Sequence, residues 1–292
     1  MRLFTMHTKT QILIRILLNR FHPKTSQEFL KGLPENEAKQ IIEHQIITAD
    51  VDPIFVKPHE FLKEIHYSWV APYVQKFPTH LQNLMVSALP NPLAASLKKY
   101  LNISDPSVFM PKPARAFFIR KLYDQVKQTE ILSPAFLPKQ DLSILLALSR
   151  REIIYLIDFL GLYDLAEELR HVVDKKSLQK VYACLDSKKI QFVRLCLHQK
   201  SRFIAAKMDL QKWKGESTEL QRKIHQRGLY RLGKALSGTH SHFMWYLLRK
   251  LDIGRSAIIE KHYKLPSSPA VTSVLIQQVI NVMNFLKPKS EM

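Results

Sequence analysis

Apolar residues recur at helical spacing through most of the chain. From Ile153 to Leu160 they occupy positions i, i+1, i+3, i+4 and i+7, which places them on one broad helical face. The stretches 178–185 and 275–286 repeat this spacing. Strict alternation of polar and apolar residues, which is typical of half-buried strands, is scarce. The pattern therefore predicts an all-α fold.

Helix ends and prolines refine this prediction. Ser149 and Glu152 have the spacing of a capping box, and Asp174 and Asp186 each precede a short apolar-periodic run, as N-caps do. Of the 16 prolines, 13 lie at or before Pro138, and none lies between residues 139 and 265. Because proline ends or begins helices, we expect an irregular multi-helix array, with short Pro-punctuated helices N-terminally and longer helices C-terminally.

Three regions follow from these patterns. We expect a basic amphipathic N-terminal segment over 1–27, a short-helix N-terminal region over 28–112 and a helical C-terminal domain over 113–292. The second boundary is soft within 104–138, because the loop-like stretches 104–113 and 133–138 both interrupt the helices.

The first segment has no acidic residue before Glu28. An Arg-containing, acid-free start fits either an amphipathic helix packed on the domain or a mitochondrial presequence. The apolar run 10–21 is interrupted by Arg15 and is too short to span a bilayer. No later stretch is expected to reach spanning length without charges, so we predict no membrane span.

Motifs for catalysis, cofactors and metals are absent from the sequence. It contains no HExxH, CxxC, GxxxxGK[ST], GxGxxG or GxSxG pattern. Gly228, Gly233 and Gly238 lie within a run that is typical of a helix with close-packing glycines. Cys184 and Cys196 cannot form a disulfide framework, which fits a reducing compartment. We therefore predict a protein that is not an enzyme and holds no cofactor or metal.

Charge gives the strongest functional signal. The 44 Lys and Arg residues exceed the 25 Asp and Glu residues by 19, and residues 175–264 alone hold 21 basic and 6 acidic side chains. Two interpretations remain open. The cations can extend from an apolar core with their stems buried, or they can form a positive surface for an acidic partner, such as nucleic acid, an acidic protein or a membrane surface.

Three stretches carry a resemblance to a known family. They are PHEFLKEIHYSWVAP (58–72), with His66, Ser68 and Trp69; the Leu-Gly-Leu run and short helices of 159–193, with Arg170; and IHQRGLYRLGKAL (224–236) followed by Trp245 and Leu247–Leu251. Together they resemble the SctK family, the YscK/MxiK/OrgA-like accessory proteins of bacterial type III secretion systems. The Pro-opened short helices are more faintly similar to the helical repeats of the flagellar switch protein FliG.

The resemblance implies a non-enzymatic adaptor in the bacterial cytoplasm, at the inner-membrane secretion apparatus. Such a subunit joins the sorting platform and links SctQ/SctL-like pod proteins to the SctD-like inner-membrane ring protein. The alternative is a basic helical nucleic-acid-binding protein.

Candidate interaction residues combine the resemblance with the charge pattern. We expect an apolar centre made of Leu229, Leu232, Leu236, Trp245 and Leu248, with cations around it. Trp69, beside the Ala71-Pro72 elbow, is either a core anchor or a partner contact. The candidate interaction residues are His66, Trp69, Arg227, Arg231, Trp245, Arg249 and Lys250.

Overall fold

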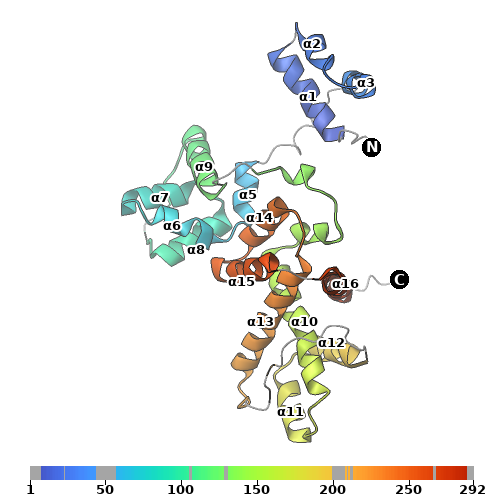
Figure 1. Ribbon diagram of the computed structural model, residues 1–292. Coiled ribbons are helices and arrows are strands. Elements are labelled where there is room, and N and C mark those ends of the chain that lie inside the picture. Colours follow the sequence, from blue (N-terminus) through green and yellow to red (C-terminus); the bar gives the residue numbers. More distant parts are fainter. Residues whose placement is uncertain are drawn as a thin grey trace, which may run out of the picture.

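The computed structural model describes residues 8–22, 24–43, 57–104, 107–127, 131–198, 208, 210, 213–265 and 268–287. Within these ranges every regular element is a helix and none is a strand, which confirms the all-α prediction. Figure 1 shows the helices in three groups that follow one another along the chain, consistent with the irregular array expected from the sequence.

The first group contains α1 (Thr8–Phe21), α2 (Ser26–Leu30) and α3 (Glu35–Glu43). Leu18, Leu30 and Ile41, one from each helix, form a small apolar cluster. The Gln11 side chain of α1 donates a hydrogen bond of 2.6 Å to Gln40 of α3. The expected first helix therefore exists and packs on α2 and α3, and this group lies apart from the other helices in Figure 1.

The middle group is built from short helices. Prolines stand in the first turn of α5, α6 and α8, where a missing backbone N–H is tolerated. Leu62, Val74, Val86, Leu97 and Leu122 lie in its apolar cluster. The elements are α5 (Pro58–Glu64), the 3₁₀ helix η2 (Tyr67–Trp69), α6 (Ala71–Val74), α7 (Thr79–Ala88), α8 (Asn91–Leu101) and α9 (Lys112–Lys127).

The C-terminal group has the longer helices that the proline-free stretch predicts; α10, for example, has 20 residues. The Ser149–Glu152 capping box and the Asp174 N-cap are both present. The elements are η3 (Pro134–Phe136), η4 (Asp141–Ala147), α10 (Arg150–Leu169), α11 (Lys175–Ala183), α12 (Ser187–His198), α13 (Ser217–Ala235), α14 (Ser241–Lys250), α15 (Ile253–Lys264) and α16 (Pro269–Leu286).

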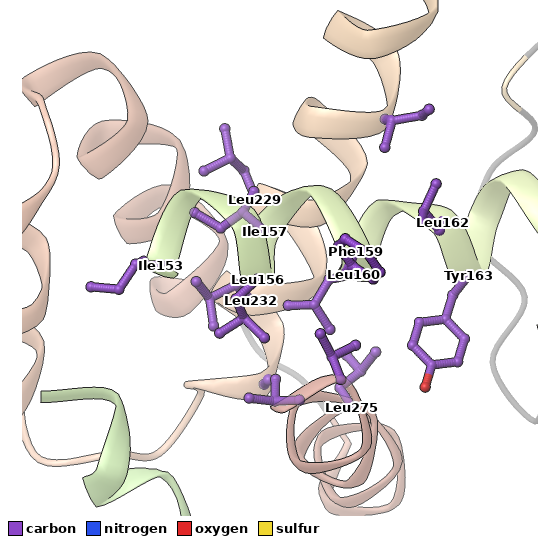
Figure 2. Close-up of a cluster of buried hydrophobic side chains, with 14 of the residues drawn as sticks. Ile153, Leu156, Ile157, Phe159, Leu160, Leu162, Tyr163, Leu229, Leu232 and Leu275 are labelled. Atoms are coloured by element: carbon purple, nitrogen blue, oxygen red, sulfur yellow. The ribbon is translucent and has the colours of Figure 1, made fainter. Parts of the chain in front are cut away.

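Apolar side chains of α10 and α13 pack together at the centre of this group (Figure 2). Gly161 and Gly228 bring the backbones of these two helices into contact. A Cβ added at Gly228 would lie 1.7 Å from the Ile157 carbonyl oxygen, and one at Gly161 would lie 1.9 Å from that of Ile224. Gly233 meets α15 in the same way. The prediction of close-packing glycines is thus confirmed for Gly228 and Gly233, whereas Gly238 follows the end of α13 at a φ of 83°.

The apolar clusters divide the chain at different places from the expected regions. The helix α1 shares its cluster with α2 and α3, across the 27/28 boundary. Ile119 and Leu122 of α9 belong to the middle cluster, although α9 begins at the 112/113 boundary. The change from the middle to the C-terminal cluster lies between Val126 and Leu142, which overlaps the soft 104–138 boundary.

The helix α16 differs from the expectation that no uncharged stretch reaches spanning length. Its 18 residues include no Asp, Glu, Lys or Arg, so it is long and apolar enough to cross a membrane by length and composition, and 22% of them are buried. Leu275, Val279 and Val282 nevertheless pack in the C-terminal cluster. Packing of this kind is also found in the core helices of proteins without a membrane span.

Candidate functional site

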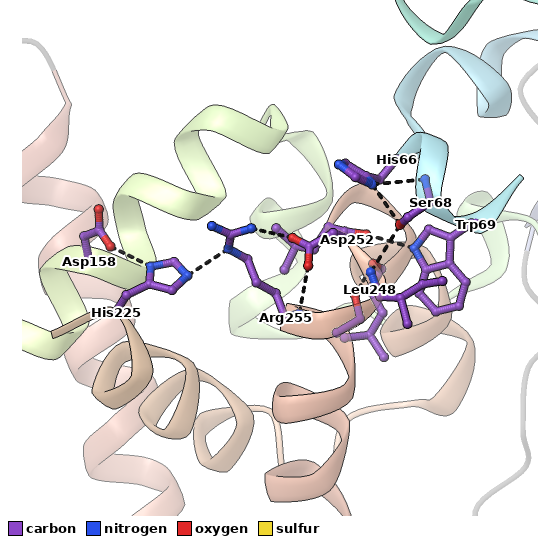
Figure 3. A network of polar contacts seen from close by, with 11 residues as sticks. His66, Ser68, Trp69, Asp158, His225, Leu248, Asp252 and Arg255 are labelled. Carbon is purple, nitrogen blue, oxygen red and sulfur yellow. Dashed lines mark hydrogen bonds and ion pairs between the residues drawn. The ribbon is translucent and has the colours of Figure 1, made fainter. Parts of the chain in front are cut away.

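Five of the seven candidate interaction residues meet where the middle group joins α14 and α15 (Figure 3 shows the η2 side of this contact). We call this contact the η2–α14 junction. The elbow around η2 supplies two of them and the last two turns of α14 supply three. They are His66, Trp69, Trp245, Arg249 and Lys250.

Arg249 is the centre of the junction. Its guanidinium lies over the ring of Trp69, 4.7 Å from the centroid, and over the ring of Trp245, 4.3 Å from the centroid. Phe61 of α5 stacks on the Trp245 ring, with 5.0 Å between the two ring centroids. Burial lowers the pKa of Arg249 to about 10, so the side chain remains charged at pH 7 and can take part in cation–π contacts.

The η2 elbow also satisfies backbone groups at the turn between α14 and α15. The His66 N–H donates to the Arg249 carbonyl oxygen at 2.8 Å, and the Trp69 indole N–H donates to the Leu251 carbonyl oxygen at 2.8 Å. The Ile253 N–H, at the start of α15, donates to Ser68 Oγ at 3.2 Å. Helix ends leave such groups without partners inside the helix, so the elbow acts as a tertiary cap.

His66 fixes the shape of this elbow. Its Nδ1 accepts the Ser68 N–H at 3.2 Å and lies 2.8 Å from Ser68 Oγ. Burial lowers the pKa of His66, and the positive charge of Arg150 lowers it further, so the imidazole is neutral at pH 7 and Nδ1 is free to accept. His66 is therefore the side-chain N-cap of the 3₁₀ helix η2.

Lys250 ties a third element to the junction. Its ammonium donates to the carbonyl oxygens of Leu146, at 2.6 Å, and Leu148, at 2.9 Å, near the end of η4. It also forms an ion pair of 2.5 Å with Glu64 of α5. Lys250 is buried, and its ammonium is paired inside the protein, so neither of the two interpretations of the basic residues describes it.

The remaining two candidates lie elsewhere. Arg231 is 1% exposed and forms a buried ion pair with Asp164 of α10. Arg227 is half-buried and lines an open groove between α13 and α15. The structure thus separates the seven residues into five at the junction, one in the core and one at a groove.

The expectation of an exposed apolar centre is wrong. Four of its five members, Leu229, Leu232, Leu236 and Leu248, are buried in the protein's own C-terminal cluster. The fifth, Trp245, packs against the middle cluster. The four leucines are covered by other helices, whereas Trp245 is only partly buried.

A second polar chain was not anticipated. Asp158 of α10 lies 2.7 Å from Nδ1 of His225 on α13, and Arg255 of α15 donates to Nε2 of the same imidazole at 2.8 Å (Figure 3). Arg255 also pairs with Asp252, which caps α15. Because both ring nitrogens of His225 are engaged, the chain links three helices and leaves no nitrogen for acid–base chemistry. Only the Asp252 cap has a local sequence signal, because Asp is a preferred N-cap residue.

The described part of the chain contains no group of three or more His, Cys, Asp or Glu side chains arranged to hold a metal ion. Comparisons with protein-family models, with curated proteins and with solved structures give no significant match. The functional interpretation therefore depends on the chain's own surfaces.

Removal of the Trp69 ring tests the junction. We expect Trp69→Ala to lower the free energy of unfolding by about 3 kcal/mol, because the ring packs on the middle cluster and on Arg249. Trp69→Phe keeps an aromatic ring but leaves the Leu251 carbonyl without its donor, and we expect a loss of about 1 kcal/mol. Urea denaturation measures both. Wild-type stability of Trp69→Ala together with lost partner binding would instead make the ring a partner contact.

Proposed function

We propose that this protein is a non-enzymatic adaptor that binds acidic protein partners through surfaces on more than one of its helical groups. The observation that carries the proposal is the placement of exposed apolar side chains beside cations on two separate groups. Patches that combine apolar and charged residues are characteristic of protein–protein interfaces.

The first such surface is the outer face of α9. Phe117 is 64% exposed, and Arg120 and Lys121 follow it at i+3 and i+4, on the same side of the helix. The opposite side of α9 packs Leu122 and Val126 into the middle cluster, which holds this surface rigidly. The loop before α9 adds Phe109, which is 92% exposed.

The second surface is the α11–α12 hairpin at the far end of the C-terminal group in Figure 1. Val173 is 97% exposed and stands directly before the cap of α11, and Leu195 of α12 is also exposed. The exposed cations of this hairpin include Lys175, Lys176, Lys180, Lys188 and Arg194. Its acidic residues Asp174 and Asp186 are engaged with backbone N–H groups, so the hairpin presents mainly positive charge to a partner.

The aromatic residues of the basic half do not favour nucleic-acid binding. Single-stranded nucleic acids are bound through aromatic rings that are open for base stacking. Here Trp245 stacks on Phe61, Tyr246 is buried, and the Tyr263 hydroxyl donates to the Thr239 carbonyl. These three rings are engaged within the protein, which disfavours base stacking on them.

The resemblance to the SctK family gives the adaptor specific partners. On this proposal the protein works in the bacterial cytoplasm, at the inner-membrane secretion apparatus. Its partners are SctQ/SctL-like pod proteins and the SctD-like ring protein. An adaptor between two assemblies needs two separate binding surfaces, and α9 and the α11–α12 hairpin belong to different helical groups.

Binding measurements with purified proteins test this function. We expect co-elution with the SctQ/SctL-like or SctD-like protein of the same organism in size-exclusion chromatography. We also expect duplex DNA to bind with a dissociation constant on the order of 10 μM or weaker near physiological salt, as for non-specific contacts. Sub-micromolar binding to DNA or RNA at that salt, with no secretion protein retained, would overturn the proposal in favour of the nucleic-acid alternative.

A further inference from the structure

A groove of about 410 Å³ runs along α13 beside α15. Four of its lining residues follow one another on α13 at i, i+3, i+4 and i+7, so they form a single stripe about 10 Å long. We call it the α13 groove. Its described lining residues are Lys223, Gln226, Arg227 and Tyr230 from α13, His262 from α15, and Met208.

Close packing of the two helices builds the wall of this groove. Gly233 allows α15 to approach α13 so closely that an added Cβ would lie 2.8 Å from the Ile259 carbonyl oxygen and 2.8 Å from His262 Cβ. This approach sets the His262 ring edge-on to Tyr230, with centroids 4.7 Å apart. The groove is therefore shaped by rigid backbone contact.

The chemistry of the lining is suited to an anion. Lys223 and Arg227 carry positive charge on adjacent turns, and Gln226 and Tyr230 add amide and hydroxyl groups. Among the described residues, the Glu219 carboxylate lies close by and pairs with Lys223 at 3.2 Å, at the N-terminal end of the stripe. The Nδ1 atom of His262 is buried and has no hydrogen-bond partner among the described residues.

We infer that the α13 groove binds an acidic segment of a partner protein. An open channel with two cations one helical turn apart, within a polar stripe of about 10 Å, fits carboxylates spaced along the face of a helix, whereas a single phosphate would use only part of the stripe. The net charge of +19 attracts such a segment over a long range. This inference rests on the proposed adaptor function and assigns it a specific surface.

The test compares two charge-reversed variants of the full chain. K223E/R227E changes the groove. R222E/K261E is the matched control, because Arg222 and Lys261 are exposed on the same two helices, do not line the groove, and give the same change in net charge. The probe is a fluorescein-labelled helical peptide of about four turns with glutamates at i, i+3, i+4 and i+7. Its glutamine counterpart serves as the uncharged control, and anisotropy reports binding.

We expect the groove variant to bind the glutamate peptide at least about tenfold more weakly than wild type, and the control variant to bind within about twofold of it. Thermal melting checks that both variants are folded. Equal weakening by both variants would overturn the inference, because the peptide would then sense net charge only. Displacement of the peptide by inorganic phosphate at low millimolar concentration, or tighter binding of duplex DNA that depends on the same two residues, would also overturn it.

Failure of the groove inference can be distinguished from failure of the proposed adaptor function. If the platform proteins bind wild type and K223E/R227E equally, the groove inference fails and the adaptor function stands. If the groove binds the peptide selectively but no platform protein co-elutes, the adaptor function within type III secretion fails and the groove remains an acidic-segment site.

Discussion

Gly228→Ala is expected to destabilise the protein by at least about 3 kcal/mol, because the new methyl group would occupy the position of a backbone atom of α10. The Cβ would lie 1.7 Å from the Ile157 carbonyl oxygen, and no rotamer can relieve this clash, because the backbone fixes the position of Cβ. The two helices must move apart, and the leucines between them, including Leu229 and Leu232, would lose contact with α10.

Chemical denaturation followed by circular dichroism measures this effect. Gly32→Ala serves as the control, since a Cβ at Gly32 meets only the Phe29 carbonyl oxygen at an ordinary 3.6 Å. We expect the control to stay within about 0.5 kcal/mol of wild type. A denaturation midpoint for Gly228→Ala equal to that of the control would contradict the close crossing of α10 and α13.

Loss of the Arg231 charge is expected to have an effect of similar size. Its guanidinium forms an ion pair with Asp164, donates to Gln278 of α16 at 2.5 Å and lies 5.5 Å from the centroid of the Tyr163 ring. Arg231→Met would leave the Asp164 carboxylate, which is 4% exposed, without a counter-charge in the core. We expect a loss of about 3–5 kcal/mol.

The double variant R231M/D164L distinguishes a buried charge from lost packing. Removal of both charges leaves apolar side chains of similar size, so its stability should return to within about 1 kcal/mol of wild type or exceed it. Urea denaturation of the two single variants and the double variant completes the cycle. A double variant as unstable as R231M would show that the shape of the arginine, and not its pairing, holds α10, α13 and α16 together.

Local features of the fold could be predicted from the sequence. The Ser149 capping box and the Asp174 cap depend on residues within three positions of each other, and both are present. The glycine spacing in α13 also predicts close packing of another helix on α13. It does not show that this helix is α10. The close contact with α10 also depends on Gly161, which lies 67 residues before Gly228 in the sequence. No local sequence pattern joins the two glycines.

The candidate site is harder to predict, because cations near leucines in a sequence also fit the charged rim of an interface with an apolar centre. The helical period contained a signal against this interpretation. Arg231 lies at i+7 from Ile224 and i+3 from Gly228, on the packed face of α13. Lys250 likewise follows Phe243 and Leu247 at i+7 and i+3, on the packed face of α14. A cation on a packed face indicates an internal partner.

The contacts of the junction depend on tertiary structure. Trp69 and the Leu251 carbonyl are 182 residues apart, and Arg249 reaches Trp69 only because the η2 elbow lies across the end of α14. The segments that carry the resemblance include both sides of this junction. Their shared role, in which the elbow caps the α14–α15 turn, depends on the three-dimensional arrangement.

Affinity capture of the full-length protein from its source cells, with and without nuclease treatment, tests the adaptor proposal most directly. At physiological salt we expect SctQ/SctL-like and SctD-like proteins to be enriched to the same extent in both samples, because a protein interface does not depend on nucleic acid. Enrichment of nucleic acid and its associated proteins, lost on nuclease treatment and without any secretion component, would contradict the proposal.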